Sequence, residues 1–177
     1  MNEEQELQNL IGSHYLDPKH YGKIENADGV GIGIDKATNQ YVVMTLSLNK
    51  THILDVKYST NSTQDAHTLA SLFIEMIKGD EISSALENSK NLEKDLDQSY
   101  ANIPEPKVDL TKPEGEQVEH ISTEYQDAAN IVLTSFRAAF RHYERAQEGI
   151  EEEHFEMGIT KSCPYSGTEC NLVQSVN

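Results

Sequence analysis

The stretch from Tyr41 to Gly79 constrains the fold of this chain most, because its hydrophobic period changes there from that of a strand to that of a helix. Apolar residues alternate with polar ones between positions 44 and 48, which is typical of a half-buried strand. After a short turn, residues 53–58 contain Ile, Val and Tyr and predict a second strand. From residue 65 onward the apolar side chains recur on one helical face. We therefore predict a strand pair, a polar loop at 59–63 and an amphipathic helix.

Elements on both sides of this stretch complete a predicted α+β fold. An opening helix is expected over residues 3–16, and it ends before Pro18 because the residue preceding a proline disfavours the helical conformation. Its expected core residues are Leu7, Leu10, Ile11 and Tyr15. A glycine-containing strand is expected at 30–34, one or two short helices at 80–96, and a long helix at about 122–147. Three strands joined by short connections predict an antiparallel sheet, packed against several helices.

Charge and hydropathy argue against three classes of protein: nucleic-acid-binding, membrane-spanning and secreted proteins. The chain carries a net charge of −16, which repels a phosphate backbone, so we expect no nucleic-acid partner. It has no apolar run of about 18 residues, so we expect no membrane-spanning helix. The acidic start MNEEQELQNL lacks the basic region and apolar segment of a secretory signal, and we therefore expect a cytoplasmic protein.

Several short motifs follow one another in a defined order. They are HYLDPKHYG at 14–22, NADGVG at 26–31, a helical segment that ends in IKG at 71–79, and RAAFRHY at 137–143. In this order they resemble the NifU/IscU-type iron–sulfur cluster assembly scaffolds, over residues 7–145. The resemblance implies a SufE/NifU-like α+β fold, with a three-stranded antiparallel sheet, several helices, a long C-terminal helix and a polar tail. It also implies a non-enzymatic protein that works through partners such as a cysteine desulfurase.

The resemblance also suggests how the chain is organised. Residues 1–147 are expected to form the NifU/IscU-like domain, with an insertion at about 109–121, and residues 148–177 an acidic and polar tail. Before the insertion, IPEPKV at 103–108 is similar to the LPPVK peptide that a specialised heat-shock chaperone recognises on such scaffolds, although Glu105 replaces a proline. The resemblance therefore implies a heat-shock chaperone as a second candidate partner, besides the cysteine desulfurase.

Scaffolds of this family hold a nascent cluster on three cysteines, because soft thiolate ligands suit the iron of a cluster. The resemblance places these positions at Thr38, Thr63 and Ala128, and the histidine that precedes the third cysteine in many members at Asp127. None of these side chains is a thiolate. The expected function is therefore that of an accessory or divergent scaffold. The alternative is a metal-free binding or regulatory module that kept the fold and lost cluster binding.

The only cysteines, Cys163 and Cys170, lie in the expected tail. Together with His154 or an acidic side chain, two thiolates could bind iron, an iron–sulfur cluster or zinc. Pro164 and Gly167 would let the segment between them turn back on itself. Their spacing is not that of a strong metal motif, so the alternative is a pair of thiols without a dedicated task.

A second candidate metal site lies at the expected start of the central helix. Asp65 and His67, with Asp127 and Asp35, could make a harder nitrogen and oxygen site for iron or zinc. The alternative is that Asp65 favours the positive N-terminal end of the helix dipole and that His67 is solvated.

Overall fold

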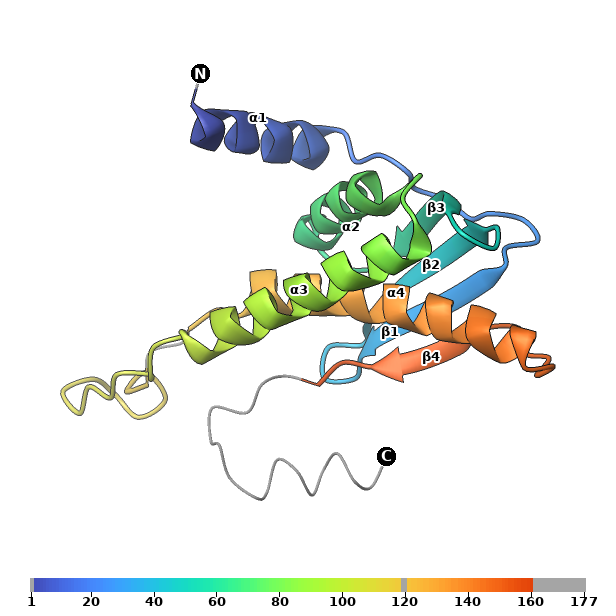
Figure 1. Ribbon diagram of the computed structural model, residues 1–177. Coiled ribbons are helices and arrows are strands. Elements are labelled where there is room, and N and C mark those ends of the chain that lie inside the picture. Colours follow the sequence, from blue (N-terminus) through green and yellow to red (C-terminus); the bar gives the residue numbers. More distant parts are fainter. Residues whose placement is uncertain (1, 119–120, 161–177) are drawn as a thin grey trace.

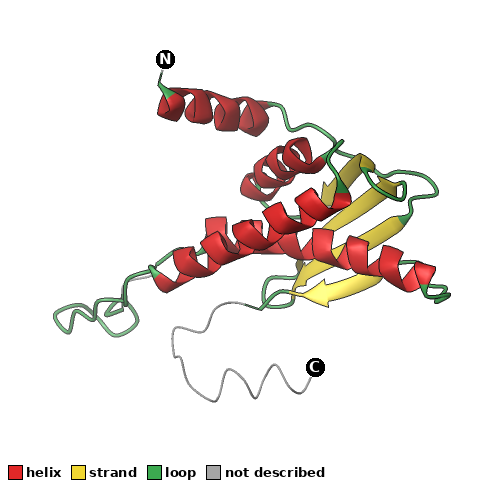
Figure 2. Ribbon diagram, in the orientation of Figure 1, coloured by secondary structure: helices red, strands yellow, loops and turns green. Residues whose placement is uncertain are grey.

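The structure is a computed structural model that describes residues 2–118 and 121–160. In chain order the elements are α1 (Glu3–Leu16), β1 (Gly29–Asp35), β2 (Gln40–Leu48), β3 (Ile53–Thr60), α2 (Gln64–Ile77), α3 (Ile82–Ala101), α4 (Glu124–Gln147) and β4 (Phe155–Gly158). Figures 1 and 2 show the helices gathered on one side of the sheet. The predicted α+β class is confirmed. No helix of the described ranges combines the length and apolar character needed to cross a membrane.

The sheet differs from the expected one. Its strand order is β3-β2-β1-β4, and β1, β2 and β3 are antiparallel neighbours as expected. β4 then pairs in parallel with β1, with Gly31 opposite Phe155. The expectation of a purely antiparallel three-stranded sheet is therefore wrong, and the sheet is mixed and four-stranded. The four residues of β4 are too short a segment to show the alternation that identifies a strand in a sequence, and their partner lies far away along the chain.

The glycines of β1 let helix α4 approach the sheet without intervening side chains. A Cβ atom at Gly31 would lie 1.9 Å from the backbone nitrogen of Ala139. At Gly33 it would lie 2.6 Å from the carbonyl oxygen of Ile131, and at Gly29 2.4 Å from that of Ala139. These pairings also show that α4 runs antiparallel to β1. The N-terminus of α4 consequently lies over the C-terminal end of β1.

The remaining core fills the space between the sheet, α2 and α4. Val42, Met44 and Leu46 of β2 are fully buried on the face that α4 covers. The rings of Phe73 and Phe136 join α2 to α4 edge to face, with centroids 5.2 Å apart. Burial of each such side chain contributes about 1.5–3 kcal/mol, so these contacts stabilise the packing of α2 and α4 on the sheet.

Helix α1 has the expected position in the sequence but not the expected core. Its side chains Leu7, Leu10, Ile11 and Tyr15 are 40–56% exposed, so the expectation that they are core residues is wrong. The buried residue of α1 is His14. Only the C-terminal part of α1 lies over α2, and the rest projects beyond it (Figure 1). The predicted helix is confirmed, but within residues 2–118 and 121–160 no element buries these four side chains.

Replacement of Gly31 by alanine tests the close approach of α4 to β1. The added methyl group cannot fit 1.9 Å from a backbone atom, so α4 must shift, and we expect the free energy of unfolding to fall by about 3 kcal/mol or more. Gly12→Ala is the matched control, since no atom lies within 4 Å of its added Cβ. In a helix interior that change should raise stability by roughly 0.5–1 kcal/mol. Urea unfolding measures both, and equal effects would contradict the packing described.

Candidate functional site

The three positions that the resemblance singled out lie at one end of the sheet. Thr38 is in the turn between β1 and β2, and Thr63 directly precedes α2. Ala128 lies near the start of α4, which the antiparallel packing places over the end of β1 that leads into the turn of Thr38. The side chains of Thr38 and Thr63 are exposed, whereas Ala128 is buried. Two loops and one helix end therefore converge here, and we call this place the α4 end of the sheet.

Side-chain hydrogen bonds tie the two loops together. The backbone N–H of Tyr41 donates to Oδ1 of Asn61 at 2.8 Å, and Nδ2 of Asn61 donates to the carbonyl of Asn39 at 3.0 Å. The Ser62 hydroxyl donates to Oε1 of Gln40 at 2.9 Å. A single asparagine thus joins the β3–α2 loop to the β1–β2 turn and to the start of β2.

A pocket opens beside the start of α2. Its volume is about 450 Å³, and it is lined by Tyr15, Leu16, Pro18, Gln64 and His67. Nε2 of Gln64 donates to the carbonyl of Tyr15 at 2.7 Å, which closes one wall. The end of α1 and the start of α2 therefore form a partly apolar recess next to Thr63.

Asp127 belongs to a hydrogen-bonded network that sequence reasoning missed. The Tyr100 hydroxyl donates to its Oδ1 at 2.7 Å, and the Thr123 hydroxyl donates to its Oδ2 at 2.9 Å. Nδ2 of Asn130 lies 3.3 Å from the Tyr100 hydroxyl. Burial raises the pKa of Tyr100, and the hydrogen bond to Asp127 raises it further, so Tyr100 stays a proton donor. The network fastens the end of α3 to the start of α4.

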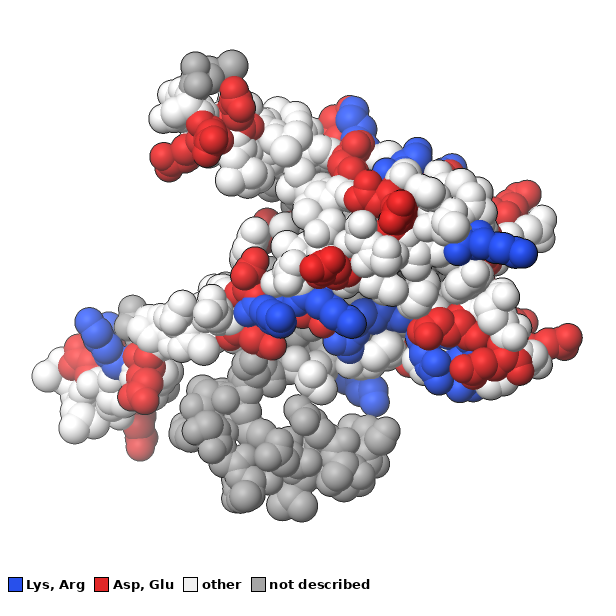
Figure 3. All heavy atoms as spheres, viewed as in Figure 1, with Lys and Arg blue, Asp and Glu red and all other residues white. Residues whose placement is uncertain are grey.

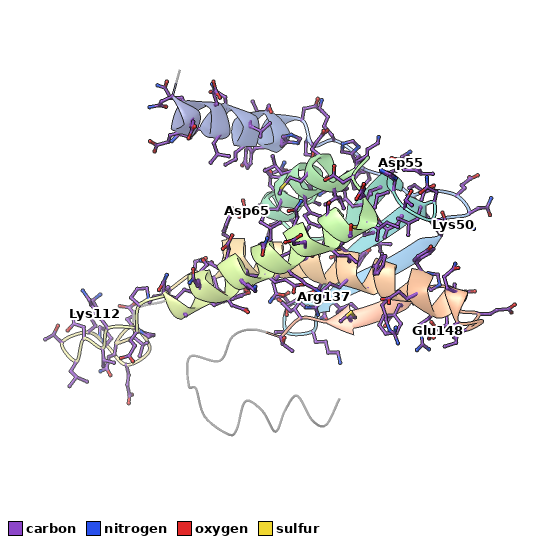
Figure 4. All side chains as sticks on the ribbon, viewed as in Figure 1. Lys50, Asp55, Asp65, Lys112, Arg137 and Glu148 are labelled. Atoms are coloured by element: carbon purple, nitrogen blue, oxygen red, sulfur yellow. The ribbon has the colours of Figure 1, made fainter. Side chains whose placement is uncertain are left out.

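His67 faces the sheet and is only partly exposed. Its Nδ1 lies 3.1 Å from the Tyr58 hydroxyl, and its ring packs against Tyr21 with centroids 5.7 Å apart. Burial lowers the pKa of His67 and raises that of Tyr58 to about 12. The expectation of a solvated His67 is therefore not met. Asp65 lies in the first turn of α2, where the helix dipole favours a carboxylate (Figure 4).

The candidate metal ligands are not brought together in the described part of the chain. Residues 2–118 and 121–160 contain no group of three or more His, Cys, Asp or Glu side chains that could hold a metal ion. Asp65, His67 and Asp127 thus do not form one site. Asp35 is buried, and its Oδ1 accepts a hydrogen bond from the backbone N–H of Ala37 at 3.1 Å. Cys163 and Cys170 lie outside the described residues.

The HYLDPKHYG motif at 14–22 is hydrogen-bonded to side chains of α2. The His14 Nδ1 lies 2.6 Å from the Ser71 hydroxyl, which also accepts the backbone N–H of Lys19 at 2.7 Å. Nε2 of His20 lies 2.7 Å from a carboxylate oxygen of Glu75 and lowers its pKa. The spacing of His67, Ser71 and Glu75 at four-residue intervals was the signal in the sequence that these residues share one helix face.

The segment after α4, residues 148–154, is held against the helix by hydrogen bonds at Glu152, and we call this segment the strap. The guanidinium of Arg145 donates two hydrogen bonds to Glu152, at 2.8 and 2.7 Å. Nδ1 of His142 accepts the backbone N–H of Val30, so its Nε2 is the donor to the Glu152 carbonyl at 2.7 Å. Figure 3 shows basic side chains along the middle of this face, over α3 and α4, bordered by acidic ones. Arg137 pairs with Glu93 at 3.2 Å and Arg141 with Glu148 at 4.0 Å, so all three arginines of α4 form ion pairs within the chain.

Tyr100→Phe tests the network around Asp127. The change removes one donor to a carboxylate in a partly buried site, and we expect the free energy of unfolding to fall by about 1–3 kcal/mol. Tyr125→Phe is the control, because Tyr125 is 57% exposed. Its change should stay within about 0.5 kcal/mol. Similar losses for both variants in urea unfolding would contradict the assignment.

The contribution of the Arg145–Glu152 pair to the free energy of unfolding depends on pH in a defined direction. The hydrogen bond and charge of Arg145 hold the pKa of Glu152 below its ordinary value of 4.5. Since the pKa is lower in the folded state, the pair stabilises the fold above pH 4.5, and this contribution is lost as the pH falls through the folded-state pKa. Carboxyl ¹³C chemical shifts of Glu152 should show a midpoint below 4.5 that rises in Arg145→Met. An unchanged midpoint would show that the pair does not persist in solution.

Known proteins resemble this chain in sequence and fold. The model of the NifU-like N terminal domain family matches residues 6–132. The iron-sulfur cluster assembly scaffold protein IscU of Aquifex aeolicus is 26% identical over 149 residues, which cover 83% of this chain and 82% of that protein. IscU 1 of Archaeoglobus fulgidus is 26% identical over 98 residues, which cover 55% of this chain and 62% of that protein.

Among solved structures, the N-terminal part of a nitrogen-fixing NifU-like protein from Brucella abortus matches with a TM-score of 0.51 and 10% identity. The match covers 77% of this chain and 92% of that chain, and it shows a common fold alone. The family match extends over well more than half of the sequence. The chain therefore belongs to the NifU-like N terminal domain family.

Proposed function

We propose that this chain is a scaffold-type protein of iron–sulfur cluster assembly, which receives cluster components from partner proteins and is not itself an enzyme. Family membership carries the proposal, together with the similarity to proteins named as IscU scaffolds. The α4 end of the sheet supports it, since two loops and a helix end converge there. The cargo would be iron or an iron–sulfur cluster, with zinc as an alternative metal.

We further propose that the chain is a divergent or accessory member. The matched stretch, residues 6–132, contains no cysteine. We align the cluster-binding cysteines of the family with Thr38, Thr63 and Ala128, whose hydroxyl and methyl groups are poor substitutes for thiolate ligands to iron. The described residues therefore do not fit a cluster by themselves. A cluster held by this chain needs ligands from beyond the matched stretch or from a partner.

A specific observation favours a second candidate function, that of a metal-free binding or regulatory module. Asp127 is held by the hydroxyls of Tyr100 and Thr123, and His67 lies within hydrogen-bonding distance of Tyr58. Polar groups near the α4 end of the sheet are thus engaged in structural hydrogen bonds. Such a module would bind partners through the retained fold without carrying metal.

The partners that we propose are those of the assembly machinery. A cysteine desulfurase is the expected sulfur source. A heat-shock chaperone is a second candidate, through residues 103–108, of which 104–107 adopt no regular secondary structure. These residues lead into an extension closed by a backbone hydrogen bond from Asp109 to Gln117 at 2.7 Å. Lys112 marks the far end of this extension in Figure 4. The extension separates the chaperone-like peptide, residues 103–108, from α4.

Metal content decides between the two functions. The full chain is purified without oxygen and then incubated with iron, cysteine, a cysteine desulfurase and dithiothreitol, whose two thiols are oxidised to a disulfide as they reduce the persulfide sulfur to sulfide. It should acquire iron and sulfide and the visible charge-transfer absorption of thiolate-bound iron. Elemental analysis and absorption spectroscopy check this expectation. A colourless protein that holds neither iron nor zinc would contradict the scaffold proposal and favour the metal-free module. Omitting the desulfurase is the control for unassisted binding.

A further inference from the structure

We propose that helix α1 pairs with α1 of a second copy of this chain, through the apolar face that projects beyond α2, to form an antiparallel and two-fold symmetric contact. This face consists of Leu7, Leu10, Ile11 and Tyr15, which recur at helical spacing, and we call it the α1 face. The pairing does not depend on whether the chain carries metal.

The α1 face continues a contact that α2 only begins. His14 lies seven residues after Leu7 on the same side of the helix, and it is buried, with its Nδ1 2.6 Å from the Ser71 hydroxyl of α2. The four side chains of the α1 face remain 40–56% exposed. Figure 1 shows the first half of α1 extending past α2, and Figure 3 shows an open notch beneath it. The side of α1 that meets α2 is therefore the side left uncovered further along the helix.

The length of α1 indicates that this side is covered by another molecule. Isolated helices shorter than about 12–15 residues are marginal in water, and helices in proteins gain most of their stability by packing an apolar face. Helix α1 has 14 residues, of which His14 is the buried one. A surface that covers the α1 face would supply the packing that the described part of the chain does not.

The area of the α1 face suits a weak, reversible dimer. Its four side chains expose on the order of 400 Å², a value within the range of about 300–600 Å² for the largest apolar patch of a monomer. Two such faces and the polar side chains beside them bury about 1,000 Å² in total, which is the lower limit of a specific interface. We therefore expect a dissociation constant between about 10 and 100 µM.

The charges of α1 favour a second copy in the antiparallel orientation. The acidic residues of α1 all lie in its first turn, whereas residues 7–16 contain neither Asp nor Glu. With Leu7 of one copy opposite Ile11 of the other, Glu3 lies opposite Tyr15, whose hydroxyl is a hydrogen-bond donor to a carboxylate. A parallel pair would bring the carboxylates of both first turns together, and these like charges repel. The same patch thus complements itself after a two-fold rotation.

The pairing brings the second copy to the recess beside Thr63. Tyr15 belongs to the α1 face and also lines this recess of about 450 Å³, together with Gln64 and His67 of α2. The first turn of the second copy, opposite Tyr15, consequently lies at the rim of the recess. A dimer would therefore narrow access to the start of α2.

Sedimentation equilibrium of the full chain in a reducing buffer tests the pairing. Leu7→Glu keeps a good helix former but places a charge in the apolar contact, so we expect the dissociation constant to rise at least about tenfold. Leu54→Glu is the matched control, because Leu54 of β3 is 51% exposed and Leu7 is 56% exposed. This control should change the constant by less than about threefold. A monomer at every concentration, or equal effects of two variants that circular dichroism shows to be folded, would overturn the proposal.

Salt distinguishes an apolar contact from an association driven by charge. Each copy carries a net charge of −16, so two copies repel each other at long range. Because salt screens this repulsion, the dissociation constant should fall about threefold or more between about 50 and 500 mM NaCl. A constant that rises with salt would contradict the apolar contact.

Disulfide cross-linking tests the orientation. In a Cys163→Ser and Cys170→Ser background, Glu3→Cys and Tyr15→Cys chains are mixed with oxidised glutathione. Two protein thiols then form one S–S bond, and one glutathione disulfide is reduced to two thiols. The disulfide between positions 3 and 15 should form at least about ten times faster than that between two positions 3, which lie about 18 Å apart along an antiparallel pair. Peptide mass spectrometry measures both, and an equal or faster disulfide between two positions 3 would overturn the antiparallel arrangement.

Binding to a cysteine desulfurase separates a second copy from a different occupant. A chain that stays monomeric and loses desulfurase binding in Leu7→Glu but not in Leu54→Glu would show that the α1 face contacts the desulfurase, and this would overturn the proposal. A dimer that fails to acquire iron would overturn the proposed scaffold function and support the pairing. The two conclusions therefore fail independently.

Discussion

The contact between the backbone of α4 and the glycines of β1 is the constraint on which the rest of the structure depends. With a hydrogen atom in place of each side chain at Gly29, Gly31 and Gly33, the helix lies directly on the strand. Side chains of β2 and of α2 then close over its two flanks, and the core forms there. Any side chain at Gly31 would force the layers apart and expose that core.

The same contact determines where chemistry is possible. It aligns α4 antiparallel to β1, so the start of the helix meets the turn that contains Thr38. Asn61 joins that turn to the loop of Thr63 through hydrogen bonds of 2.8 and 3.0 Å. These contacts hold the two loops without the side chains of Thr38 and Thr63. Packing and hydrogen bonds within the chain therefore hold the loops at this end of the sheet.

The strap after α4 and strand β4 hold the chain that follows α4 against the helix and the sheet. Glu152 is held by Arg145 and His142, and β4 extends the sheet beyond β1. Thr160 is then held by Asn130, at the start of α4. The chain thus runs back along α4 from its C-terminal end to its N-terminal end.

The sequence alone predicted helices α1, α2 and α4, the three antiparallel strands and the family, because these depend on local periodicity and on motifs of fixed order. The expectation of one or two short helices at 80–96 left open what the structure shows as the single 20-residue helix α3, Ile82–Ala101. Periodicity reports a helix face but not what covers it, so Leu7 and Leu10 were wrongly expected in the core. β4 escaped prediction because its pairing depends on β1, a strand distant in the sequence.

Tertiary structure alone decided how the site is built. The hydroxyl of Tyr100 reaches Asp127 from another helix, and no spacing within the chain predicts that contact. The glycine pattern of β1 was visible in the sequence, but its meaning required the helix that lies against it. Residues adjacent in space and remote in sequence are joined by packing, and packing is a property of the whole fold rather than of any one segment.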